Sequence, residues 1–317
     1  MKALVTGADG FIGRILCRML RQQCWDIRTV DMKYKAFDSA RTGHWSGSYD
    51  DWELYVNDKY DVIFHLGASS LLGPSVRSPL SYFDNNVSRM NRMLSHIVRE
   101  KSCQNIIFAS SAATYGDPGK DIALKEEHAG HPCNPYGWSK LMGEITLEQA
   151  CLAYGLKGYS MRFFNVAGAY EDLGQDLDQP HILTKMSVAR LENRTFYING
   201  NTYDTYDGTC VRDYIHVADV CDALIAAAHN IVSQPGTSYT EYNVCSGTKT
   251  SNRELTEMFS GMFGLTHNVM EGRPGDPGYL YGDNSNTVNE LNWSPKMDTY
   301  DIIESHYDYV RKKMNAN

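Results

Sequence analysis

Tyr136 and Lys140 lie four positions apart in a stretch that reads as one helix, residues 134–154, and so share a face of that helix. A tyrosine near its free pKa of about 10 is a poor base at neutral pH, and a neighbouring ammonium favours the phenolate. Ser111 follows an apolar, strand-like run and could hydrogen-bond the same substrate hydroxyl. A Tyr-x-x-x-Lys spacing also occurs in surface pairs. Ser111 therefore favours a catalytic group over a surface pair, and the three residues together predict proton transfer at a substrate hydroxyl.

Gly7, Gly10 and Gly13 stand between an apolar run at residues 2–6 and an apolar pattern of helical spacing at residues 11–20. The pattern predicts a strand, a tight turn and a helix. Glycine there lets the backbone approach a pyrophosphate, whose charge then lies at the helix N-terminus. A purely structural turn would carry the same triplet, so the motif alone leaves both interpretations open.

Asp31 ends the second apolar segment, where a carboxylate can accept hydrogen bonds from an adenosine ribose. The same carboxylate would repel a 2′-phosphate, so NAD is favoured over NADP, although Lys33 and Lys35 weaken that preference. Without the glycines, Asp31 would equally be a solvated acid at a strand end.

Further apolar segments at residues 60–66 and 105–109 end in small or polar residues and are separated by stretches long enough for helices. They predict an α/β fold with a doubly wound parallel sheet, which binds ligands at the carboxyl ends of its strands. A chain of 317 residues favours two lobes. We place the dinucleotide-binding domain at residues 1–168, with 213–245 returning to it, and a smaller C-terminal α/β substrate-binding lobe at 169–212 and 246–317. Residues 32–59 show no sustained periodicity and are not assigned.

The composition is that of a globular protein, with 42% hydrophobic and 21% charged residues. The 30 Lys and Arg against 38 Asp and Glu give a net charge of -8, which argues against a nucleic-acid partner. The eight cysteines are scattered, as expected for free thiols in a reducing compartment, and no spacing predicts a metal site. No stretch has the length of a signal peptide or a membrane span, so we expect a cytoplasmic protein without a membrane partner.

Longer stretches of the sequence resemble a known family. They are P-L-S-Y-F-D-N-N-V at 79–87, F-A-S-S-A-A-T-Y-G at 108–116, R-F-F-N at 162–165 and, most specifically, D-G-T-C-V-R-D-Y-I-H-V at 207–217. With the glycine motif, Ser111, Tyr136 and Lys140, these stretches resemble the extended short-chain dehydrogenase/reductase family and, within it, the UDP-glucose (UDP-galactose) 4-epimerases. The resemblance runs through nearly the whole chain and implies a Rossmann-like fold, NAD as cofactor and a UDP-sugar as substrate.

The resemblance also implies roles for individual residues. The residues expected to contact NAD are Gly7, Gly10, Phe11, Ile12, Gly13, Asp31, Leu66, Gly67, Ala68, Ser69, Asn85, Lys140 and Phe164. Those expected to contact the UDP-sugar are Ser111, Tyr136, Asn165, His181, Arg212, Arg273, Asp276 and Leu280. Arginine suits a diphosphate because its planar donors pair bidentately. Two alternatives stay open: Arg212 could pair with Asp213, and His181 could be a surface histidine.

The residues after Ser111 discriminate between reactions. Related dehydratases and decarboxylases carry an acidic residue shortly after this serine, whereas this chain has Ala112-Ala113-Thr114. The expected reaction is therefore reversible hydride transfer at C4 through a 4-keto sugar, which makes the protein an isomerase. The alternatives are another NAD-dependent nucleotide-sugar modifier, such as a dehydratase or a glucuronate epimerase, and a non-catalytic NAD sensor. A sensor has little need for Ser111, Tyr136 and Lys140 together.

Two positions depart from the family pattern. The chain has Ser70 where the epimerases often carry a lysine, and only Ser48-Tyr49-Asp50 where many members have an aspartate that holds adenine. The expected retention of NAD is correspondingly weaker. Leu280 stands at the position of the family's sugar-pocket gate and is intermediate in size, so it does not separate glucose from N-acetyl or pentose substrates. Residues 81–100 and 135–154 resemble the helices through which this family forms homodimers.

Overall fold

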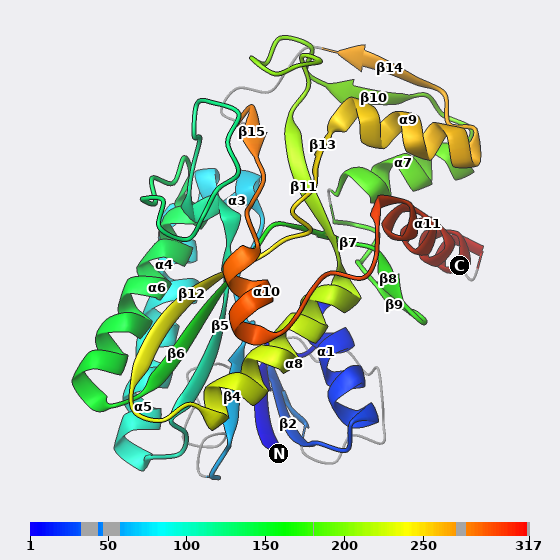
Figure 1. Cartoon of the computed structure of the whole chain (residues 1–317). Helices are drawn as coiled ribbons and strands as arrows, with labels where there is room; N and C mark the ends of the chain where they lie inside the picture. Colours follow the sequence, from blue (N-terminus) through cyan, green and yellow to red (C-terminus); the bar gives the residue numbers. More distant parts are fainter. Residues whose placement is uncertain (33–43, 47–57, 180, 271–276, 316–317) are drawn as a thin grey trace. The chain divides into compact units, whose positions relative to one another are not determined.

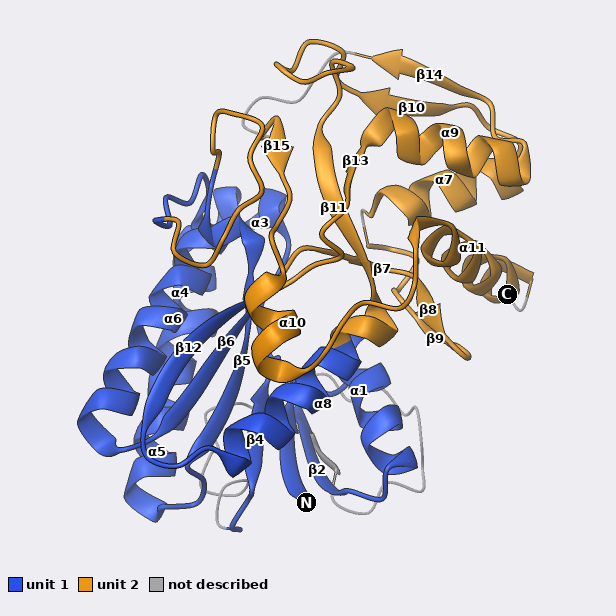
Figure 2. Cartoon of the chain, viewed as in Figure 1, with its two compact units in different colours: residues 1–116, 129–162, 221–242 blue, residues 117–128, 163–220, 243–317 orange. Residues whose placement is uncertain are grey.

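The computed structural model describes residues 1–32, 44–46, 58–179, 181–270 and 277–315. The chain divides into two compact units (Figure 2). Unit 1 comprises residues 1–116, 129–162 and 221–242, and unit 2 comprises residues 117–128, 163–220 and 243–317. Both units are therefore assembled from segments that are distant in the sequence.

A seven-stranded sheet in the order β12-β6-β5-β4-β1-β2-β3 forms the centre of unit 1 (Figure 1). Its strands are β1 (Lys2–Thr6), β2 (Asp26–Asp31), β3 (His44–Ser46), β4 (Val62–His65), β5 (Asn105–Ser111), β6 (Lys157–Phe163) and β12 (Ser238–Val244). β1 pairs in parallel with β2 on one side and with β4 on the other. The strand order reverses between β1 and β4, and the carboxyl ends at such a switch point are where ligands bind in open α/β sheets.

Helices cover both faces of this sheet, with α5 and α6 on one side and α1 and α8 on the other (Figure 1). The helical segments are α1 (Phe11–Gln22), α3 (Leu72–Arg77), α4 (Pro79–Phe83), the π-helical turn η1 (Asp84–Ser88), α5 (Arg89–Glu100), the 3-10 turn η2 (Ala112–Thr114), α6 (Pro135–Tyr154) and α8 (Val217–Ser233). One core cluster joins Leu4, Ile63 and Ile106 of the strands to Met93 of α5 and Leu147 of α6. Burial of this apolar surface fixes α6 against β5.

Unit 2 contains smaller sheets and its own core. Its elements are β7 (Asn165–Ala167), β8 (Ala169–Tyr170), β9 (Leu173–Gly174), α7 (Ile182–Leu191), β10 (Phe196–Asn199), β11 (Val211–His216), β13 (Lys249–Ser251), α9 (Asn252–Phe263), β14 (His267–Met270), β15 (Tyr279–Leu280), α10 (Ser285–Leu291) and α11 (Thr299–Asn315). β11 pairs with β7, β13 and β15. Leu183 of α7, Phe259 of α9 and Ile303 of α11 meet in one apolar cluster.

The structure confirms the predicted doubly wound α/β fold. The helix expected over residues 134–154 is α6, begun by Pro135 at its first position and capped by Asn134, whose side chain accepts a bond from Gly137 N. β3 lies in the region that the sequence left unassigned and extends the sheet beyond β2. The assignment of NAD binding to one domain and of nucleotide-sugar binding to the other stays a prediction.

Within the described parts of the chain, no helix is long and apolar enough to cross a membrane. The same residues contain no cluster of three or more His, Cys, Asp or Glu that could hold a metal ion. All eight cysteines are free thiols, and only Cys24 and Cys133 are exposed.

Candidate active site

The glycine-rich turn joins β1 to α1 and owes its shape to close backbone contacts. Gly7 has a φ of +70°, and a Cβ there would lie 2.6 Å from Gly67 N. A Cβ on Gly13 would lie 2.1 Å from Gly7 O, so the helix packs directly on the turn. Gly10, by contrast, is exposed just before the first residue of α1. The first and third glycines thus build the turn, while the second leaves the helix N-terminus open to an anion.

The carboxylate of Asp31 is tied to this turn. Asp31 ends β2, and its Oδ2 accepts a hydrogen bond of 3.0 Å from Asp9 N. This contact holds the acid beside the glycine motif, which is where a ribose hydroxyl of a bound dinucleotide would reach it. The turn and the acid therefore fit NAD. Lys33, Lys35 and the Ser48-Tyr49-Asp50 segment lie outside the described residues.

On the other side of β1, the segment after β4 is held by side chains of its neighbours. Gly67 N donates to Thr6 Oγ1 at 3.2 Å, and Ser69 N donates to Asn86 Oδ1 at 2.8 Å. Asn85 Nδ2 lies 3.1 Å from Ser69 Oγ. The residues predicted to contact NAD at 66–69 and 85 therefore form one connected group at the carboxyl end of β4.

Asn86 is a structural partner of this group that the sequence analysis missed. It is buried, its Nδ2 donates to Ser69 O at 2.9 Å, and the same nitrogen lies 2.9 Å from Ser139 Oγ on α6. It therefore links the cofactor-side loop to the helix of Tyr136 and Lys140. The signal was present in the repeated asparagine of the Asn85-Asn86 pair, which lies in the π-helical turn η1, a distortion common at functional sites.

The three predicted catalytic residues come together in unit 1. Ser111 is the last residue of β5, and its Oγ accepts a bond of 3.2 Å from Ala113 N as it caps η2. Tyr136 lies in the first turn of α6 and hydrogen-bonds with Ser111. Lys140, one turn later, is buried, and its Nζ donates to Ala109 O at 2.6 Å and lies 4.8 Å from the centre of the Phe108 ring. β5 and α6 thus supply one serine–tyrosine–lysine constellation.

Burial dominates the electrostatics of this constellation. It raises the pKa of Tyr136, while the hydrogen bond with Ser111 lowers that pKa. It lowers the pKa of Lys140 to about 7, against the opposing effect of Glu144. His65, which bonds Thr6 Oγ1 at 2.8 Å, has a pKa lowered to about 3 by burial and by Lys140. We expected the Lys140 ammonium to favour a phenolate at Tyr136. In the folded chain by itself, burial instead favours the neutral phenol of Tyr136.

Unit 2 places three of the predicted substrate residues on neighbouring strands. In the parallel ladders of β11, Arg212 is opposite Leu280 of β15 and Tyr214 is opposite Asn165 of β7. Phe164, predicted to contact NAD, is buried, and its N–H donates to Val244 O at 3.2 Å. β11 is therefore the element that organises the predicted substrate side.

The structure decides between the two interpretations of Arg212. Successive side chains of a strand point to opposite faces, so Arg212 and Asp213 diverge. Arg212 Nη1 donates to Val211 O at 2.8 Å and Pro277 O at 2.9 Å. The buried Asp213 instead accepts bonds from the backbone and hydroxyl of Ser246 and from Gly247 N. The half-buried arginine is thus positioned by main-chain carbonyls.

His181 has a local structural role. Its Nδ1 caps α7 by accepting a bond of 3.3 Å from Leu183 N, and its ring stacks on His306 with 5.7 Å between ring centres. Burial and Lys185 lower its pKa to about 4, so the ring is neutral at physiological pH. The side chain is half-buried at the start of α7, and the predicted sugar contact stays a prediction. Arg273 and Asp276 lie outside the described residues.

Comparisons with known proteins identify the family. Residues 3–245 match the model of the NAD dependent epimerase/dehydratase family. A UDP-glucose 4-epimerase of Lactobacillus helveticus is 34% identical over 316 residues, covering 96% of this chain and 94% of that protein. These matches confirm the resemblance found in the sequence.

Solved structures agree with this assignment. The UDP-glucose 4-epimerase of Stenotrophomonas maltophila, with bound NAD and formylated UDP-arabinopyranose, matches with a TM-score of 0.92 and 26% identity over 100% of both chains. The enzyme of Bifidobacterium longum, in complex with NAD+ and UDP, matches with a TM-score of 0.89 and 27% identity over 100% of both chains. A family model that covers most of the chain, a relative above 30% identity and a shared fold lead to one conclusion: the chain belongs to the NAD dependent epimerase/dehydratase family.

Proposed function

We propose that this protein is an NAD-dependent UDP-sugar 4-epimerase. The observation that carries the proposal is the junction of Ser111 at the end of β5 with Tyr136 and Lys140 of α6. The segment after Ser111 supports epimerisation over elimination. Ala112 is buried there, and the Thr114 hydroxyl donates to Ser111 O at 2.8 Å, so this turn offers no acid that could drive loss of water.

The chain's own residues would act on the proton of the sugar C4 hydroxyl. Tyr136 takes this proton as a base, Ser111 hydrogen-bonds the same oxygen, and Lys140 supports the developing phenolate. NAD, when bound, supplies the oxidised nicotinamide that takes the C4 hydride and later returns it. The resulting 4-keto sugar turns while its UDP group stays held, so that the opposite face of C4 is reduced, and Tyr136 returns the proton to the C4 oxygen. The pKa of Tyr136, which burial raises, would be lowered beside the positive nicotinamide of bound NAD.

The substrate side of the proposal rests on unit 2. Arg212 suits a diphosphate because its guanidinium is always charged and presents planar donors. Asn165 and Leu280 lie opposite residues of the same strand, β11, and are proposed to contact the sugar nucleotide. His181, Arg273 and Asp276 complete the proposed set from the family resemblance.

The replacement Tyr136→Phe tests the proposal. Turnover of UDP-glucose to UDP-galactose, followed by NMR, should fall about 10²–10⁴-fold because the base is removed and the ring is kept. Tyr154→Phe, an exposed tyrosine at the end of the same helix, is the matched control and should keep wild-type turnover. Unchanged turnover in Tyr136→Phe overturns the role of Tyr136. Bound nicotinamide without any exchange at C4, across a panel of UDP-, dTDP- and GDP-sugars, points to the sensor alternative.

A homodimer and a cytoplasmic location belong to the same proposal. α6 carries exposed apolar side chains at Trp138, Met142, Ile145 and Leu152, and such a patch is typical of a protein interface. The family pairs through the equivalent helices, and sedimentation over a range of concentrations would measure the state here. The free thiols of all eight cysteines support a reducing compartment.

A further inference from the structure

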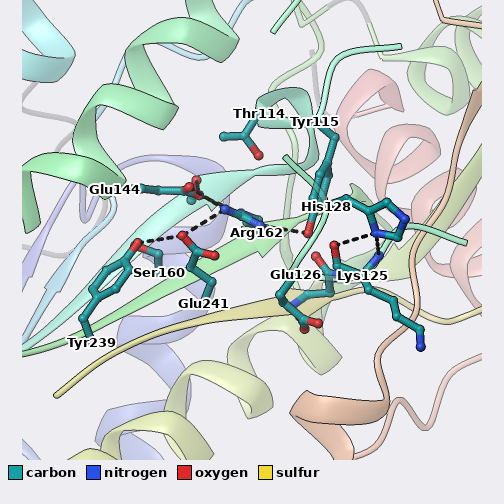
Figure 3. A network of polar contacts seen from close by, with 12 residues as sticks. Thr114, Tyr115, Lys125, Glu126, His128, Glu144, Ser160, Arg162, Tyr239 and Glu241 are labelled. Carbon is teal, nitrogen blue, oxygen red and sulfur yellow. Dashed lines mark hydrogen bonds and ion pairs between the residues drawn. The ribbon is translucent and has the colours of Figure 1, made fainter. Parts of the chain in front are cut away.

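A buried polar network lies inside unit 1 on the elements that carry the proposed catalytic residues (Figure 3). Its centre is the ion pair of Glu144 on α6 with Arg162 on β6, whose side chains are 1% and 4% exposed. The pair is bidentate, with 2.9 Å between Arg162 Nε and Glu144 Oε1 and 2.7 Å between Nη2 and Oε2. Two parallel bonds of this kind fix the direction of both side chains.

Other groups complete the network. Ser110 Oγ donates to Glu144 Oε1 at 2.5 Å. Arg162 donates to the Tyr115 hydroxyl at 3.0 Å, and its Nη2 lies 3.0 Å from a second carboxylate, Glu241 of β12. Tyr239 of β12 donates to the same Glu241 oxygen at 3.3 Å. A single arginine therefore holds two carboxylates.

Glu144 and its partner Ser110 both lie close in the sequence to proposed catalytic residues. Glu144 lies one helical turn after Lys140, on the same face of α6. Ser110 directly precedes Ser111 in β5. A change in the position of Glu144 would therefore move the helix of Lys140 relative to the strand of Ser111.

The charges of the network complement Lys140. The carboxylate of the network that acts on the buried ammonium is Glu144, whereas Glu241 lies on the far side of Arg162. Among the described residues, the groups shown to face Lys140 are Glu144 on its own helix, His65 on β4, and the Phe108 ring and Ala109 carbonyl on β5. His65 is neutral at physiological pH because its pKa is lowered to about 3. Glu144 opposes the effect of burial on the pKa of Lys140.

We infer that Glu144, fixed by Arg162 and Ser110, is a positioning residue that acts through Lys140: it holds α6 against β5 and places a negative charge one helical turn from the buried ammonium. Glu241 has a different role, because it pairs with Arg162 from β12. The inference rests on the proposed function, since it assigns Glu144 to the same constellation.

The replacement Glu144→Gln tests the inference because it keeps the shape and the hydrogen-bond acceptor but removes the charge. Loss of this negative charge lowers the pKa of Lys140 further and disfavours its ammonium form. The pH profile of turnover should shift to lower pH by about 0.5–1 unit, and maximal turnover should fall about tenfold. Glu241→Gln is the matched control, since it removes the same charge from the other side of Arg162. It should leave the pH profile unmoved.

A second readout needs no substrate. Protein labelled with ¹⁵N at lysine Nζ allows the Lys140 resonance, assigned with Lys140→Ala, to be titrated by NMR. The midpoint should be lower in Glu144→Gln than in wild type and in Glu241→Gln. If the midpoint moves but wild-type protein turns over no UDP-sugar, the proposed function fails while the coupling of Glu144 to Lys140 stands.

An unchanged Lys140 midpoint and pH profile in a folded Glu144→Gln protein overturns the inference, as does an equal shift in Glu241→Gln. Should Glu144→Gln fail to fold, Glu144→Asp replaces it. The shorter side chain keeps the charge but draws it away from Lys140, so the same shifts are expected at smaller size. Wild-type turnover and pH profile in Glu144→Asp would then contradict the positioning role.

Discussion

The two units bury ionisable side chains in opposite ways. Unit 1 keeps Glu144 and Arg162 charged by pairing them, in a network with several further hydrogen bonds. In unit 2, His216 and His306 are buried and His181 is half-buried, and their pKa values all lie below the ordinary value because burial disfavours the charged form. Unit 1 thus contains a buried pair of opposite charges where chemistry is proposed, whereas the imidazoles of these three histidines in unit 2 are neutral.

The difference follows from the partners available. The guanidinium of Arg162 meets a carboxylate in bidentate geometry, which offsets the desolvation of both ions. The histidines of unit 2 meet neutral partners: His216 lies 3.0 Å from Ser305 Oγ, and His306 lies 3.0 Å from Thr184 Oγ1. A neutral imidazole can use a hydroxyl, and at His216 the charge of Asp301 opposes the effect of burial without outweighing it. Unit 2 should therefore be sensitive to acid, and unit 1 to the loss of one partner.

The largest expected effect comes from breaking the pair in unit 1. Arg162→Met leaves the buried Glu144 and the partly buried Glu241 without their cation, which should destabilise the protein by about 3–5 kcal/mol. Urea denaturation followed by circular dichroism measures this. Arg194→Met is the control, because Arg194 pairs with Glu192 on the surface with 61% of its side chain exposed, and should change stability by less than about 1 kcal/mol. Equal urea midpoints for the two variants would remove the contrast between the units.

A smaller effect is expected from acid acting on unit 2. The pKa of His216 is lowered to about 4 by burial, so the unfolded chain binds this proton below pH 6.5 and the folded chain does not. Stability is therefore lost as the pH falls from about 6.5 toward 4, by about 2 kcal/mol for this group at pH 5. His216→Asn can still accept the bond from Ala218 N and should flatten the pH dependence by that amount. The measurement is denaturation of both proteins at pH 7 and pH 5. If the variant loses as much stability between these pH values as wild type does, His216 does not titrate as described.

An effect of similar size concerns Lys140, which unit 1 buries with a pKa of about 7. Because the folded state binds this proton less readily than the unfolded chain, the destabilisation is greatest below pH 7 and declines as the pH rises toward 10.5. Lys140→Met should therefore stabilise the protein by about 2–3 kcal/mol more at pH 6 than at pH 9, while abolishing turnover. Thermal melts at both pH values test this. A loss of stability at pH 6 would show that the ammonium contributes to the fold instead of opposing it.

Local sequence patterns predicted much of the fold and part of the site. The apolar runs located β1, β2, β4 and β5, the Pro135 start located α6, and the spacing of Gly7, Gly10 and Gly13 located the turn. These features depend on residues close in the chain, which a periodicity or a turn motif can report. β3 was missed because it has three residues and lies in a segment without periodicity.

The sequence by itself determined the family, through its motifs, and the parallel sheet, and it led to the proposal of Ser111, Tyr136 and Lys140 as catalytic residues, because strand ends and helix faces follow from the periodicity of side chains. Only the tertiary structure decided what surrounds these residues. Asn86 contacts Ser139 across 53 positions, and Ser110 contacts Glu144 across 34. Such pairs have no local signature, since packing of α6 on β5 is what brings them within reach. The same packing excludes water, and exclusion of water decides which buried groups stay charged and which stay neutral.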